Sequence, residues 1–115
     1  DRLRSRGLGD VYKRQSYYDV IRHESGSLAG TTIEMIPKGF SKAVGIAAVI
    51  KIQNIPWEDT IVFGDSNNDL SMFEYAAYKV AMGNSSKKIL NLADYVTEDM
   101  FHYGIRNGLS HLGLI

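Results

Sequence analysis

The 115-residue chain contains no cysteine, and it has only two prolines and one tryptophan. Without cysteine it can form neither a disulfide nor a thiolate zinc site, which suits the reducing cytoplasm that we expect for it. No apolar run approaches the roughly 20 residues that a transmembrane helix needs, so we expect no membrane partner. The formal net charge is zero, and a hydrophobic content of 44% is typical of a globular protein.

The first fifteen residues differ in character from the rest. The segment from Ser5 to Gln15 resembles the translation of the transposase adapter used to prepare short-read sequencing libraries, and we interpret residues 1–15 as an adapter-derived artefact. We expect natural sequence to begin near Ser16 and the part before it to be missing, so that the chain is a fragment. Residues 16–115 carry eight basic and eleven acidic side chains, a net charge of −3, which offers no bulk attraction to nucleic acid.

Strand-like and helix-like segments alternate along residues 16–115. Apolar and β-branched runs predict strands at residues 17–23, 31–36, 60–63, 78–82 and 95–97. Ser41 is a good N-cap for a helix that ends before Asn54 and Pro56. Further helices are predicted at residues 68–76, 85–92 and 103–112. This alternation predicts an α/β fold, in which helices flank a parallel sheet.

The loop that follows the third predicted strand is the most informative feature of the chain. Gly64 permits a sharp turn, and Asp65, Asn67, Asn68 and Asp69 follow it closely. In open α/β sheets ligands bind beyond the carboxyl ends of the strands, so functional side chains are expected here. Dense oxygen ligands suit a hard cation such as Mg²⁺, which takes one or two carboxylates together with phosphate oxygens. The sequence therefore predicts two of these residues, Asp65 and Asp69, as metal ligands.

Other interpretations of this loop compete with a metal site. Its side chains could simply cap backbone groups at a strand-to-helix turn. An EF-hand calcium loop is excluded, because Leu70 stands where its Gly should be and Ala76 where its Glu should be. A Gly-Asp-Ser-type serine esterase would use Ser66 as nucleophile, with Asp99 and His102 as orienting acid and base. The segment between Ser66 and Asp99 is short for such a hydrolase. A non-catalytic Rossmann-like binding module is the remaining alternative.

Four ordered segments carry a family resemblance: Ile36–Ala43, Gly64–Asp69, Val80–Asn84 and Ala93–Thr97. The first is similar to the lysine motif and the second to the acidic motif of haloacid dehalogenase (HAD) superfamily phosphatases. The other two are similar to segments that the Cof-type sugar-phosphatase branch carries downstream. The likeness covers nearly all of residues 33–115 and departs from the family at Tyr103, where an acidic residue is usual.

The resemblance implies a partial Rossmann-like HAD core. Residues 33–115 would form the C-terminal part of that core, and residues 16–32 would be the tail of an inserted cap domain and the return to the core. The family's nucleophile motif, Asp-x-Asp-x-Thr, occurs nowhere in the 115 residues. We therefore expect the fragment alone to be inactive, and to be marginally stable or aggregation-prone because it would lack a central strand of the sheet.

The resemblance also implies an activity, which is Mg²⁺-dependent hydrolysis of small phosphorylated metabolites such as sugar phosphates, through an aspartyl-phosphate. Asp65 would coordinate Mg²⁺ directly, and Asp69 would bind a metal-bound water or hold the loop in place. Lys42 would reach the phosphoryl group from a position opposite Asp65, and Asn68 would donate to a phosphate oxygen. Lys42, Asp65 and Asp69 are thus the candidate catalytic residues. Asn84 follows Gly83 at a strand end and would either cap the next helix or line the pocket, and we favour capping.

Overall fold

The structure, a computed structural model, describes residues 17–22 and 33–115. Its main elements are, in chain order, β1 (Tyr18–Arg22), β2 (Ile33–Pro37), α2 (Lys42–Ile52), β3 (Ile61–Gly64), α3 (Leu70–Tyr75), β4 (Tyr78–Ala81), α4 (Lys87–Leu92), β5 (Tyr95–Val96) and α5 (Gly104–His111). Short 3₁₀ helices lie between them: η1 (Trp57–Asp59), η2 (Asn67–Asp69) and η3 (Met100–His102). The artefact predicted at residues 1–15 lies outside the described residues, as does most of the predicted cap tail at residues 16–32.

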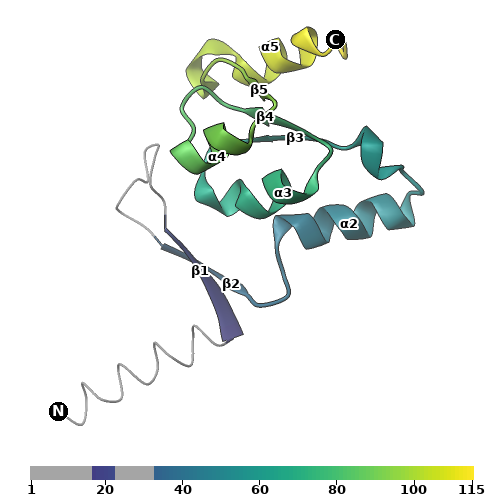
Figure 1. Ribbon diagram of the computed structural model, residues 1–115, viewed down its shortest axis with the longest axis vertical. Helices are drawn as coiled ribbons and strands as arrows, with labels where there is room; N and C mark the ends of the chain where they lie inside the picture. Colours follow the sequence, from purple (N-terminus) through teal and green to yellow (C-terminus); the bar gives the residue numbers. More distant parts are fainter. Residues whose placement is uncertain (1–16, 23–32) are drawn as a thin grey trace, which may run out of the picture.

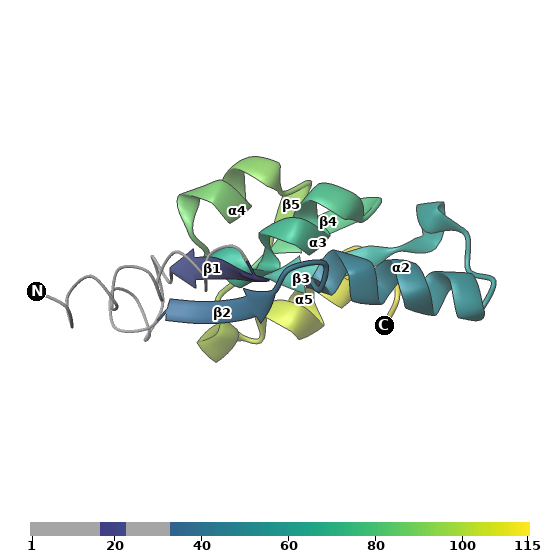
Figure 2. The same cartoon turned by 90° about the horizontal axis from the view of Figure 1, so that it is seen from below.

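The central feature of the fold is a parallel three-stranded sheet with the order β3-β4-β5. Each pair of neighbouring strands is joined through a helix, α3 in the first case and α4 in the second. These two helices cover one face of the sheet, and α5 lies against the other (Figures 1 and 2). Two successive crossovers of the same hand, running in the same direction along the sheet, place both helices on one face. The predicted α/β fold with a parallel sheet and flanking helices is therefore confirmed.

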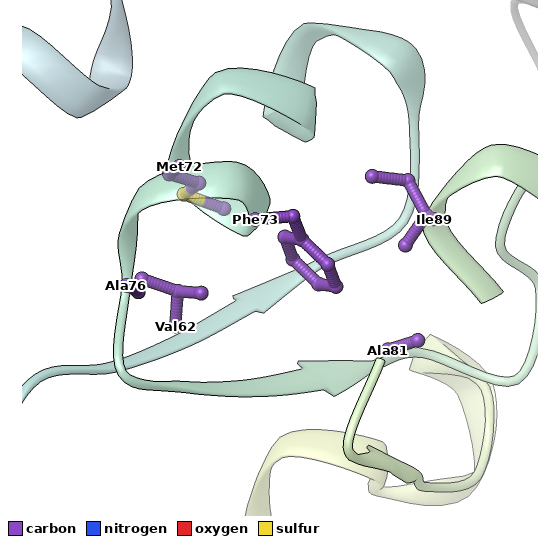
Figure 3. Packing of buried hydrophobic residues seen from close by; sticks show 6 residues of the cluster. All are labelled: Val62, Met72, Phe73, Ala76, Ala81 and Ile89. Atoms are coloured by element: carbon purple, nitrogen blue, oxygen red, sulfur yellow. The ribbon is translucent and has the colours of Figure 1, made fainter. Parts of the chain in front are cut away.

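The hydrophobic core lies between the sheet and the α3–α4 layer. Phe73 of α3 and Ile89 of α4 are fully buried in this core. Val80 of β4 is also fully buried, but on the face that α5 covers. Figure 3 shows Phe73 between the two helices and the strands, beside Met72, Ala76 and the strand residues of the cluster. On the opposite face α5 approaches closely because it carries Gly108, where a Cβ would lie 2.6 Å from a ring carbon of Phe63.

The strands β1 and β2 form a separate antiparallel pair, in which Tyr18 lies opposite Pro37 and Arg22 opposite Ile33. Figure 1 shows this pair standing apart from the parallel sheet. The turn after β2 leads directly into α2, so the hairpin delivers the chain to the start of that helix. The two strands were expected from their composition, and the structure adds their antiparallel pairing.

Helix α2 packs against the core through Ile46 but is only partly covered. It carries no buried residue, although its sequence is almost entirely apolar, and Val49 and Ile52 are 55% and 75% exposed. Its hydrogen bonds to other described elements are both made by its first two residues. The neighbouring strand β3 pairs only with β4 in the described part of the chain, which leaves its other edge open. None of the described helices has the length and apolar character needed to cross a membrane.

Candidate active site

The loop after β3 is folded around the carboxylate of Asp69. The backbone N–H groups of Asp65 and Ser66 donate to Oδ2 of Asp69 at 2.9 and 3.3 Å. Asp69 is only 4% exposed, and the chain passes close to it because Gly64 has no side chain: a Cβ there would lie 2.7 Å from Oδ2 of Asp69. A carboxylate that accepts two backbone N–H groups fixes the path of the loop. The position of Asp65 is thereby set by Asp69.

Lys42 reaches this loop from the first turn of α2. Ser41 caps the helix by accepting from the N–H of Val44 at 3.2 Å, which starts the helix at Lys42. The ammonium group of Lys42 forms an ion pair with Oδ1 of Asp69. A cation at a helix N-terminus is unfavourable by itself, and the carboxylate of Asp69 offsets that cost. The sequence predicts Asp65 as the residue opposite Lys42, whereas in the structure the direct partner is Asp69, which then contacts Asp65.

Asp65 itself is half-buried, and its two carboxylate oxygens differ. Oδ2 accepts a hydrogen bond from the side-chain amide of Asn84 at 3.2 Å. Oδ1 has no hydrogen-bond partner among the described residues. Asn84 was expected to cap a helix, but the N-cap of α4 is Ser86, and Asn84 contacts the site. The missed signal is positional: Asn84 follows β4, and parallel neighbours such as β3 and β4 end at the same edge of the sheet.

Asn68 lies at the wall of a cavity of about 270 Å³ beside the loop. Its Oδ1 accepts from the hydroxyl of Ser66 at 2.7 Å. Its side-chain N–H groups have no partner in the described part of the chain. The same cavity is lined by Lys42 and by the apolar side chains Ile36 and Phe40. The structure therefore brings Lys42 and Asn68 to one cavity.

A cation would find only a small set of protein ligands here. The described residues contain no cluster of three or more His, Asp or Glu side chains suited to a metal ion. Mg²⁺ does not require one, since it is usually held by one or two carboxylates and keeps several waters. Asp65 offers the uncommitted Oδ1, whereas both oxygens of Asp69 are occupied by Lys42 and the loop backbone. Oδ1 of Asn84, which is buried and has no hydrogen-bond partner among residues 17–22 and 33–115, adds a further acceptor beside Asp65. These groups fit Mg²⁺ with Asp65 as the direct ligand and Asp69 as the residue that holds the loop.

The three residues of the esterase alternative are not joined. His102 and Asp99 form a hydrogen-bonded pair, with Nδ1 and Oδ1 2.6 Å apart, at the exposed turn η3. The hydroxyl of Ser66 donates instead to Asn68 and accepts from the backbone of Asp69. No hydrogen bond among the described residues connects Ser66 to His102 or Asp99. The serine thus belongs to the local structure of the loop.

The Asp99–His102 pair predicts a pH effect confined to η3. The hydrogen bond from His102 lowers the pKa of the Asp99 carboxyl from its ordinary value, with further help from the N–H of Phe101. A depressed folded-state pKa stabilises the protein above the unfolded-state pKa, and the contribution is lost as the pH falls through the folded-state value. We expect an NMR titration of the full-length protein to give Asp99 a low midpoint, and His102→Ala to raise it. An unchanged midpoint in the variant would assign the shift to the backbone alone.

Comparison with known proteins shows the family to which the chain belongs. A family model described as haloacid dehalogenase-like hydrolase matches residues 12–109. The phosphatase YwpJ of Bacillus subtilis is 38% identical over 86 residues, which are 75% of this chain and 30% of that protein. The 5-amino-6-(5-phospho-D-ribitylamino)uracil phosphatase YitU of the same organism is 36% identical over 86 residues, covering 75% of this chain and 32% of that protein.

Solved structures show the same fold. A sugar phosphatase of HAD subclass IIB superimposes with a TM-score of 0.78 at 31% identity, over 96% of this chain and 41% of that one. The chain thus spans about a third of the length of these two curated relatives and two fifths of the solved structure. The family model covers most of the chain, and the resemblance to the Cof-type branch is confirmed. The chain belongs to the haloacid dehalogenase-like hydrolases.

Proposed function

We propose that the full-length protein carrying this chain is a Mg²⁺-dependent phosphatase that acts on small phosphorylated metabolites such as sugar phosphates. The observation that carries the proposal is the chain of contacts from the ammonium group of Lys42 through Asp69 to the backbone of Asp65. Through these contacts the ammonium group of Lys42 lies beside the carboxylates that follow β3, and Lys42 also lines a cavity. The names of the relatives support a phosphate ester as the substrate class.

In this proposal Asp65 holds Mg²⁺, and Asp69 holds Asp65. When bound, Mg²⁺ supplies positive charge that offsets the negative charge of the phosphoryl oxygens. Asp69 acts through position: its Oδ2 accepts from the N–H of Asp65, and its Oδ1 pairs with Lys42. Replacing Asp69 would therefore disturb two other residues of the site at once.

Lys42 and Asn68 are the proposed contacts to the phosphoryl group. An ammonium group has three N–H donors, so Lys42 can keep its bond to Asp69 and still donate to phosphate oxygens. The bond from Ser66 to Oδ1 of Asn68 fixes the amide. The side-chain N–H groups of Asn68 make no hydrogen bond to the described residues, so they are available to a phosphate oxygen. Both residues line the same cavity, whose volume of about 270 Å³ suits a phosphoryl group and part of a small ester. No Asp-x-Asp-x-Thr motif occurs in the 115 residues. In this proposal the attacking carboxylate is therefore supplied from outside them.

The proposal is tested by assaying the full-length protein against a panel of phosphorylated sugars and p-nitrophenyl phosphate, with Mg²⁺ and then with EDTA. We expect release of inorganic phosphate that stops when EDTA removes the metal and returns when Mg²⁺ is restored. Hydrolysis of carboxylic esters in place of phosphate esters would support the esterase alternative. Absence of any hydrolysis across the panel would contradict the proposal.

The lysine can be tested separately. We expect Lys42→Met in the full-length protein to lower kcat/KM for p-nitrophenyl phosphate by about 10- to 100-fold, because one charged donor to the phosphoryl group is lost. We expect a smaller loss of kcat/KM than for a fully buried donor, since the Lys42 side chain is 46% exposed. Lys38→Met is the matched control, because Lys38 lies in the turn between β2 and α2 and its side chain is exposed. Equal activity of the two variants would remove Lys42 from the proposed site.

A further inference from the structure

Asn84 has two polar side-chain atoms in opposite situations. Its Nδ2 donates to Oδ2 of Asp65 at 3.2 Å. Its Oδ1 is buried and has no hydrogen-bond partner in the described part of the chain. A buried acceptor without a donor destabilises the folded protein. Such a group in a folded protein calls for a water or an ion that completes it.

The orientation of this amide is set by the charge of Asp65. An ionised carboxylate only accepts hydrogen bonds, and an amide offers donors on nitrogen and acceptors on oxygen. Turning the amide over would place its oxygen against a carboxylate oxygen, with no proton between them. The unpaired Oδ1 of Asn84 is therefore a consequence of the contact that Nδ2 makes.

The loop that carries Asn84 is fixed to the loop that carries Asp65. The N–H of Met82 donates to the carbonyl of Gly64 at 2.9 Å, which extends the β3–β4 pairing. The N–H of Ser86 donates to the carbonyl of Asp65 at 2.9 Å. These bonds on both sides of Asn84 hold its backbone beside that of Asp65.

We propose that Asn84 is a positioning residue for the cation at Asp65: its amide holds Oδ2 of Asp65, which leaves Oδ1 for the cation, and its own Oδ1 accepts from a water of the cation's hydration shell. The inference rests on the proposed function, in which Asp65 holds Mg²⁺. It accounts for both atoms of Asn84, since Mg²⁺ keeps several waters and these need acceptors. Groups that orient a metal ligand in this way contribute to metal affinity without being ligands.

The test is direct binding of Mn²⁺, used as a spectroscopic substitute for Mg²⁺, to the full-length protein. Free Mn²⁺ gives an electron paramagnetic resonance signal that disappears on binding, so a titration yields Kd without any assay of activity. We expect Asn84→Ala to raise Kd about tenfold. Asn91→Ala is the matched control, because Asn91 is an exposed residue of α4 with no contact to the site, and its Kd should equal that of the wild type.

A double-mutant cycle separates positioning from a general loss of structure. In the Asp65→Asn background, Asn84→Ala should raise Kd no further, because the carboxylate that Asn84 holds is already gone. An equal increase in both backgrounds would assign Asn84 a structural role and overturn the inference, as would wild-type Kd for Asn84→Ala alone. If Asp65→Asn itself binds Mn²⁺ like the wild type, the metal site and the inference both fail. If the binding results are as expected but no phosphate ester is hydrolysed, the inference stands and the proposed function fails.

Discussion

Asp65→Asn in the full-length protein is expected to lower turnover of p-nitrophenyl phosphate about 100- to 1000-fold, the loss typical of removing one preorganised electrostatic contact to the reacting group. The substitution keeps the size of the side chain and removes the charge that would hold Mg²⁺. It also places an amide opposite the amide of Asn84. The measurement is phosphate release at saturating Mg²⁺, repeated over a range of Mg²⁺ concentrations to separate weaker metal binding from slower chemistry.

Two further variants make this result specific. Asp59→Asn is the matched control for loss of one negative charge, because Asp59 is an exposed residue of η1, and it should keep wild-type activity. Ser66→Ala should retain much of the activity, since its hydroxyl serves the loop through Asn68 and Asp69. Activity that survives Asp65→Asn but is abolished by Ser66→Ala would overturn the phosphatase proposal in favour of the esterase.

Gly64→Ala is expected to damage both the site and the stability of the fold. The new methyl group would lie 2.7 Å from Oδ2 of Asp69 and 2.8 Å from a ring carbon of Phe73. Neither neighbour can move freely, because Phe73 is fully buried and Asp69 is held by Lys42 and by the loop backbone. Overpacking of this kind costs about 1–3 kcal/mol of unfolding free energy. A displaced carboxylate also moves Asp65 and Lys42, so we expect turnover to fall by about 100-fold as well.

Gly45→Ala is the control for that variant. Gly45 lies in the middle of α2, and a Cβ there would meet no atom within 4 Å. The same substitution should therefore stabilise the protein by roughly 0.5–1 kcal/mol through helix propensity. Urea unfolding of the full-length protein measures both changes, and phosphate release measures the activity. If Gly64→Ala unfolds at the wild-type urea concentration, the close packing around Asp69 described above is wrong.

The elements of the fold were largely predictable, because each carries a local signal. Ser41 marks the start of α2, and the apolar run before Gly64 marks β3. The helix predicted from residue 68 begins instead as the 3₁₀ turn η2, with α3 starting at Leu70. That difference follows from Asp69, whose carboxylate turns back to the loop backbone and tightens the first turn.

The candidate site was predictable in composition but not in its contacts. The resemblance of the lysine and acidic segments to family motifs predicted that Lys42 and the Asp65 loop lie together. Which carboxylate meets the lysine depends on tertiary distances that no local pattern contains, and the structure selects Asp69. For Asn84 the sequence favoured capping over the pocket for a related reason: a Gly-Asn turn after a strand is typical of helix capping, and only the adjacency of β3 and β4 brings its amide to Asp65.

The weak anchoring of α2 has a consequence for kinetics. The helix supplies Lys42, yet its hydrogen bonds to other described elements come only from its first two residues, and beyond them it is held by half-buried side chains such as Ile46. If the lysine is needed for turnover, the observed rate is the intrinsic rate multiplied by the fraction of molecules in which the helix is docked. A substitution near the far end of α2, at Val49 for example, can then tune the enzyme's speed without touching substrate. Natural sequence variation in this helix would then change the turnover rate while the residues of the site stay the same.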